Sequence, residues 1–229
     1  MRENINMSES FENGYKEGTI DIETMPDGGR DLELYEKELM FSRDELAGKD
    51  VLDLGTGPEL KLAEGLKAAG VTAHVVSMSP DFSQEKHRER AQKAAPGNEM
   101  VAGLGQQLPF GDETFDVVLA NHVVQHLENR KRYYQLIMEA ARALKKGGKA
   151  IIGPMYDRTG ADPLEQLNDN PEVQDAMARL HTELSIAYIP KDVKPALRID
   201  MGGGMYSSKR VQAFNIIITK VAEVEESSR

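Results

Sequence analysis

The stretch Val51-Leu52-Asp53-Leu54-Gly55-Thr56-Gly57 places a carboxylate and two glycines where a short apolar run ends and a helical pattern begins. Glycine lets the backbone approach a ligand closely, and the start of a helix offers free amide donors. A dinucleotide-binding turn would carry a third glycine at position 60, but this chain has Leu60, which disfavours a dehydrogenase. The sequence therefore predicts a ligand-binding turn; the alternative is that Asp53 only stabilises the turn.

Two histidines, His122 and His126, follow Asn121 at the end of another strongly apolar run. Open α/β sheets bind ligands beyond the carboxyl ends of their strands. His122 is therefore the candidate general base, because an imidazole titrates near neutral pH; the alternative is that it caps a helix or lines the pocket. The i, i+4 spacing also fits a metal pair, but we find no third ligand and predict no metal site.

These residues must be positioned by the elements around them, and apolar runs alternate with helical patterns along the middle of the chain. We predict strands at 51–54, 71–78, 99–102, 115–120 and 149–153, with helices at 60–69, 82–95 and 133–144 between them. Lys145-Lys146-Gly147-Gly148 is interpreted as the C-cap of the last helix. Strands separated by such helices indicate βαβ units, so the predicted fold class is α/β with a doubly wound, mostly parallel sheet.

The flanking segments are predicted to add to this core within a single domain. Residues 1–47 read as an N-terminal flap and a helix that Asp31 caps, and residues 48–153 as the α/β core. Residues 154–210, which contain five prolines and a helical stretch near 171–187, interrupt the alternation and are interpreted as a lid. Residues 211–229 supply a closing strand and a tail.

In three places the chain resembles the class I S-adenosylmethionine-dependent methyltransferases, in particular their small-molecule enzymes. Val51–Gly57 is similar to the first motif of that family, and Leu108–Val118 to its lead into the fourth strand. Ala141–Gly148 is similar to the helix end before its fifth strand. Each segment alone is weak, but the order and spacing together indicate a Rossmann-like methyltransferase fold.

The resemblance implies an S-adenosylmethionine site and a small-molecule acceptor methylated on O, N or C by in-line displacement. Asp53 would orient the methionine end of the cofactor, with the backbone of Gly55 and Gly57 beside it. His122 would face the methyl group. The full set of implied cofactor contacts is Asp53, Gly55, Thr56, Gly57, Ser77, Met78, Leu104, Gly105, Gln106 and Asn121.

Two positions depart from the family's pattern. Ser77 stands where the family usually has an acid for the ribose hydroxyls, and Leu104 stands where an acid often reads the adenine amino group. Losing two charge-assisted hydrogen bonds would weaken cofactor binding by about two to four decades, unless Gln106 or Gln107 supplies an acceptor. The alternatives are a modified cofactor, or a non-catalytic binding or scaffold protein that kept the fold.

Composition limits the classes of partner and compartment. The 229 residues include 28 Lys and Arg against 38 Asp and Glu, for a formal charge of −10, which disfavours a nucleic-acid partner. The absence of Cys excludes disulfides and thiolate chemistry and fits a cytoplasmic setting. We expect no membrane span and no export signal. Oligomeric state and acceptor identity are left open.

Overall fold

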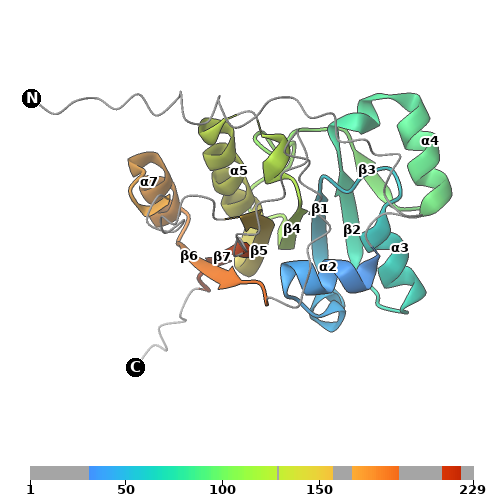
Figure 1. Ribbon diagram of the computed structural model, residues 1–229, viewed down its shortest axis with the longest axis horizontal. Coiled ribbons are helices and arrows are strands. Elements are labelled where there is room, and N and C mark those ends of the chain that lie inside the picture. Colours follow the sequence, from blue (N-terminus) through green and yellow to red (C-terminus); the bar gives the residue numbers. More distant parts are fainter. Residues whose placement is uncertain (1–30, 128, 157–166, 191–212, 223–229) are drawn as a thin grey trace, which may run out of the picture.

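The computed structural model describes residues 31–127, 129–156, 167–190 and 213–222 (Figure 1). The helical elements are α2 (Leu32–Leu39), η2 (Arg43–Leu46), α3 (Lys61–Ala68), η3 (Pro80–Ser83), α4 (Glu85–Ala94), η4 (Val124–His126), α5 (Arg130–Ala143) and α7 (Pro171–Arg179). The strands are β1 (Asp50–Leu54), β2 (His74–Met78), β3 (Glu99–Val101), β4 (Phe115–Asn121), β5 (Leu144–Tyr156), β6 (Thr182–Tyr188) and β7 (Ala213–Lys220).

The seven described strands form one sheet in the order β3-β2-β1-β4-β5-β7-β6. The first five in that order pair in parallel, whereas β7 pairs antiparallel with both β5 and β6. The chain adds β2 and β3 on one side of β1 and then β4 and β5 on its other side. The carboxyl ends of β1 and β4 therefore lie at the switch point of the sheet, where open α/β folds bind ligands. The predicted doubly wound, mostly parallel α/β fold is confirmed.

Helices cover both faces of the sheet, as strands buried on both sides require (Figure 1). Alternate residues of β1 show the division: Leu52 and Leu54 join a core with α5 and α7, while Val51 joins a second core with α2 and α3. Asp53 is on the α2 and α3 face with Val51, because side chains alternate along a strand. The buried carboxylate of Asp53 therefore lies on the face of the sheet that α2 and α3 cover.

Side-chain caps fix where two of these helices begin. The Asp31 carboxylate accepts a hydrogen bond from the Leu34 amide at 2.8 Å, as the sequence predicted for the start of α2. Asn129 caps α5 by accepting from the Arg132 amide at 3.0 Å. The buried stripe of α2 is formed by Leu32, Tyr35, Glu38 and Leu39, so one glutamate faces the sheet together with the apolar side chains.

Two predictions about local structure were wrong. The helical stretch expected near 171–187 ends at Arg179, and Thr182–Tyr188 forms the edge strand β6 instead. Lys145–Gly148 belongs to the start of β5 and does not form a separate C-cap, because Leu144 already has an extended backbone after α5. Most of the expected lid, residues 157–166 and 191–210, and the expected flap, residues 1–30, lie outside the described residues.

Candidate functional site

Asp53 is the most unusual side chain at the carboxyl edge of the sheet. It is fully buried, and neither carboxylate oxygen has a hydrogen-bond partner of normal geometry. Burial raises the pKa of Asp53 to about 7, and the nearby Thr56 and Tyr35 hydroxyls only partly offset this rise. Burying a carboxylate without hydrogen-bond donors costs free energy. Asp53 can therefore accept hydrogen bonds from a ligand.

The turn after β1 has the backbone shape that the two glycines predict. Gly55 has φ +71°, and a Cβ there would lie 2.6 Å from Cγ2 of Val123, which excludes any side chain. Gly57 has φ +68° with open space around a virtual Cβ. The buried hydroxyl of Thr56, between them, also has no hydrogen-bond partner. A ligand lying along this turn would meet backbone on one side and unpaired oxygens on the other.

Ser77 lies directly beside Asp53, because the two residues are register partners in β2 and β1. Ser77 is buried, and its hydroxyl oxygen accepts a hydrogen bond from Nδ2 of Asn98 at 2.9 Å. Its own O–H therefore stays available as a donor. The position expected to carry a ribose-binding acid thus carries a serine hydroxyl, which is hydrogen-bonded to the side-chain amide of Asn98.

The other residues predicted to contact the cofactor, at the end of β2 and after β3, include both core and surface residues. Met78 is buried, with its sulfur 3.1 Å from the virtual Cβ of Gly103. A side chain at Gly105 would clash with Leu136, whose Cδ1 would lie 2.7 Å from an added Cβ. Leu104 is 48% exposed. Gln106 follows in the same turn and is partly buried, and it carries the polar group nearest in sequence to the missing adenine-binding acid.

A second buried polar cluster centres on Glu38, which the sequence analysis missed. Its carboxylate accepts Nδ2 of Asn121 at 3.0 Å and lies 3.1 Å from Nε2 of His122. Glu38 is 0% exposed and His122 is 5% exposed. His122 has φ +58°, a conformation that non-glycine residues adopt where surrounding contacts hold them.

Two further amides complete this cluster. Gln125 donates from Nε2 to the carbonyl oxygen of Pro154 at 2.9 Å, and the same Nε2 lies 3.3 Å from Nδ1 of His122. Asn215 of β7 donates from Nδ2 to the backbone carbonyl of Glu38 at 2.9 Å. Helix α2, strand β4 and strand β7 are therefore tied together at the carboxyl edge.

Asp53, Ser77 and Asn121 thus share the α2 and α3 face of the sheet, at its carboxyl edge, with Thr56 in the adjoining turn. His126 lies farther along, in η4, and is exposed. Within the described residues, no three His, Asp or Glu side chains gather closely enough to hold a metal ion. In that same part of the chain, no helix is both long and apolar enough to cross a membrane.

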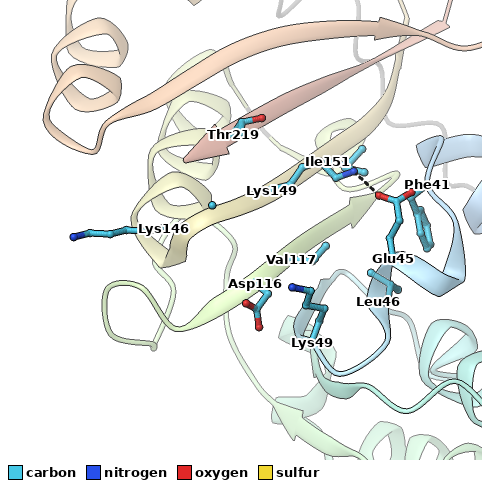
Figure 2. A pocket seen from close by; sticks show the side chains of 11 residues that line it. Phe41, Glu45, Leu46, Lys49, Asp116, Val117, Lys146, Lys149, Ile151 and Thr219 are labelled. Atoms are coloured by element: carbon cyan, nitrogen blue, oxygen red, sulfur yellow. Dashed lines mark hydrogen bonds and ion pairs between the residues drawn. The ribbon is translucent and has the colours of Figure 1, made fainter. Parts of the chain in front are cut away.

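A hollow of about 360 Å³ lies at the opposite, amino edge of the sheet (Figure 2). Its charged lining residues are Glu45, Lys49, Asp116, Lys146 and Lys149, and Lys149 is paired with Glu45 at 2.9 Å. The charges that line this hollow are mixed and partly paired, whereas the site residues that the sequence predicts lie at the carboxyl edge.

Comparisons with known proteins find similarity to methyltransferases. Residues 52–152 match the model of a family described as a methyltransferase domain. An uncharacterized protein of Methanocaldococcus jannaschii is 33% identical over 118 residues, which cover 52% of this chain and 53% of that protein. An uncharacterized methyltransferase of Mycobacterium marinum is 32% identical over 109 residues, covering 48% and 40%. The chain thus spans about half or less of the length of these relatives.

A solved TehB-like S-adenosylmethionine-dependent methyltransferase of Corynebacterium glutamicum has the same fold, with a TM-score of 0.54 and 18% identity. The superposition covers 84% of this chain and 90% of that one. The match to the family model includes β1, the glycine turn, β4 and most of β5, the same elements that build the site. Residues 52–152 are therefore similar to a methyltransferase domain, and the fold is that of solved S-adenosylmethionine-dependent methyltransferases.

Proposed function

We propose that this protein is a methyltransferase that uses S-adenosylmethionine and methylates a small-molecule acceptor. The single observation that carries the proposal is the buried carboxylate of Asp53, without normal hydrogen-bond partners, beside the Gly55–Gly57 turn. The amino group and ribose hydroxyls of the cofactor are hydrogen-bond donors, and Asp53 and Thr56 offer unpaired acceptor oxygens. The residues present therefore fit the cofactor.

Bound S-adenosylmethionine would supply a methyl carbon on a positively charged sulfur, from which a nucleophile takes the methyl group while the S–C electron pair stays on sulfur. The chain's own part is to hold the two reactants in line and exclude water. Asp53 and Thr56 accept from the cofactor's donors, and the backbone at Gly57 leaves room for it. Ser77 donates one hydrogen bond where an acid would accept two, and Gln106 offers an amide near the adenine position.

Calorimetric titration with S-adenosylmethionine and, separately, with S-adenosylhomocysteine tests this proposal. We expect micromolar binding of either ligand and at least tenfold weaker binding to Asp53→Asn, because the amide carries no charge and returns an N–H toward the ligand. Asp175→Asn, on the exposed face of α7, is the matched control and should bind as the wild type does. Absence of binding at millimolar ligand would refute the proposal and favour the scaffold alternative.

A further inference from the structure

We propose that the methyl acceptor is an amine, bound as its ammonium ion beside His122, and that Glu38 is the positioning residue that makes Nδ1 of His122 the base. This inference rests on the proposed methyltransferase function and names the substrate class of the same site. The observation behind it is the direction of the hydrogen bonds around His122.

The chain of bonds starts at Pro154, whose backbone carbonyl can only accept. The side-chain nitrogen of Gln125 must therefore face it, at 2.9 Å. That same nitrogen lies 3.3 Å from Nδ1 of His122 and presents an N–H to it. Nδ1 is then the unprotonated nitrogen, and the proton of the neutral imidazole is on Nε2, 3.1 Å from the Glu38 carboxylate. Glu38 thereby fixes the tautomer in which Nδ1 can take a proton.

The same reasoning leaves two amide oxygens facing away from the protein's own donors. Asn121 uses its nitrogen on the Glu38 carboxylate, which also only accepts, and Gln125 uses its nitrogen as described above. Asn121 Oδ1 and Gln125 Oε1 are buried and have no hydrogen-bond partner. Asn121 directly precedes His122 in the chain, and Gln125 follows it by three residues. Asn215 Oδ1 is also unpartnered, but it lies against Gly153 and has no space for a ligand.

This set of acceptors distinguishes an ammonium from a hydroxyl. A hydroxyl group has one hydrogen to donate. If it donates that hydrogen to Nδ1, neither amide oxygen receives a hydrogen bond. A primary ammonium brings three, enough for Nδ1 and for the oxygens of Asn121 and Gln125. Its N–H would take the place of the long 3.3 Å contact of Gln125, while the contact with Pro154 keeps that amide in place. The net charge of −10 also favours the approach of a cation.

The proton balance follows. One ammonium proton moves to Nδ1, which leaves a neutral amine with a free lone pair and an imidazolium whose Nε2–H still faces the Glu38 carboxylate. The amine nitrogen would then form the new N–C bond as the S–C bond of the bound cofactor breaks and its electron pair stays on sulfur, so the product is a methylated ammonium. The proton on Nδ1 passes to solvent when the product leaves.

Nitrogen NMR of the full chain with ¹⁵N-labelled histidine rings tests the positioning role without any acceptor. The chain has five histidines, so the loss of one signal in His122→Gln assigns His122. At neutral pH we expect the Nε2–H form in the wild type and a mixture of tautomers in Glu38→Gln, whose amide offers either a donor or an acceptor. Glu36→Gln, two residues earlier on α2, is the matched control and should leave the signal unchanged. An Nδ1–H form in the wild type would overturn the assignment of the base, and an unchanged tautomer in Glu38→Gln would overturn the role of Glu38.

The substrate class is tested with small probes on the same labelled protein. Methylammonium chloride should shift the His122 ring signals and the Gln125 side-chain amide saturably, at concentrations at least tenfold below those at which methanol acts. Tetramethylammonium, which carries the charge without N–H donors, and potassium chloride should leave these signals in place. Equal responses to methylammonium and methanol, or no response to methylammonium, would overturn the amine. Calorimetry with S-adenosylhomocysteine reports separately: methylammonium bound at His122 without cofactor binding would refute the methyltransferase and retain the cation site.

Discussion

The two polar centres of the site differ in how far the sequence reveals them. Asp53 could be found, because it stands between an apolar run and a glycine turn. Glu38 was missed, although it falls three residues after Tyr35 on the apolar stripe of α2, and a charged residue in such a stripe is a recognisable signal. Its partners Asn121 and His122 are 83 and 84 residues away in the chain. Contacts over that separation follow only from the packing of α2 on the sheet, which no local pattern specifies.

The raised pKa of Asp53 predicts an unusual pH dependence of stability. Between about pH 4 and pH 7 the folded state holds a proton on Asp53 that the unfolded chain has released, so this group's contribution to stability falls as pH rises. Relative to Asp53→Asn, the wild type should lose up to about 1.4 kcal/mol per pH unit across that window. Urea unfolding of both proteins at pH 5 and pH 7 measures the difference, with Asp175→Asn as control. A constant difference at the two pH values would show that Asp53 is ionised in the folded state throughout.

At the level of elements, the predicted strands and helices of the core are present because their apolar periods are long and glycine or a polar cap marks their ends. Strand β6 was missed for a physical reason. Leu180, Leu184 and Ala187 continue the helical spacing of α7, while Leu184 and Ile186 also fit a strand. The break comes at His181, whose φ of +50° ends the helix. Pairing with β7 decides between the two periods, and the pairing residues of β7 are 26 to 38 residues further along the chain.

Helix α2 carries Glu38 and Tyr35 to the site, and Leu39 anchors it. Leu39 is 0% exposed among the core side chains of α3 and the sheet. Leu39→Ala should reduce the free energy of unfolding by about 2–5 kcal/mol. Leu34→Ala, the same substitution on a half-buried position of the same helix, should cost less than about half as much. Chemical denaturation compares them; equal losses would mean that α2 is not anchored through its buried stripe.

On the scale of the molecule, ion pairs join the strand starts at the amino edge. Lys145 pairs with both Asp50 of β1 and Asp116 of β4, at 3.0 Å for the latter. Hydrogen bonding from Lys145 holds the pKa of Asp50 below its ordinary value; the pKa of Asp116 is also lowered, because the Asp50 amide and Lys145 together outweigh its desolvation. These carboxylates therefore stabilise the fold above their unfolded pKa, and the contribution is lost as pH falls through the lowered folded values.

Replacing this lysine should separate the electrostatic tie from the packing. Lys145→Met is expected to lower stability by up to about 1 kcal/mol at pH 7, since the groups are partly exposed. The loss should shrink in about 1 M salt, and it should also shrink as the pH falls through the lowered folded pKa values of Asp50 and Asp116, where these carboxylates become protonated. Lys37→Met, which breaks an exposed pair with Glu33 on α2, is the control. A loss that persists in acid and in salt would assign the effect of Lys145 to its aliphatic stem.

The position of β7 in the sheet determines when a newly made chain can bind the cofactor. Although β7 comes after the other described strands in the sequence, it lies between β5 and β6, and its Asn215 reaches back across 177 residues to Glu38. A chain still on the ribosome before residue 213 emerges has two strand edges open inside the sheet, which are sites for wrong pairing. It also lacks the hydrogen bond from Asn215 to the Glu38 carbonyl. Binding of S-adenosylhomocysteine by ribosome-bound chains of increasing length should therefore appear only once β7 has emerged, so synthesis of this strand times the assembly of the site.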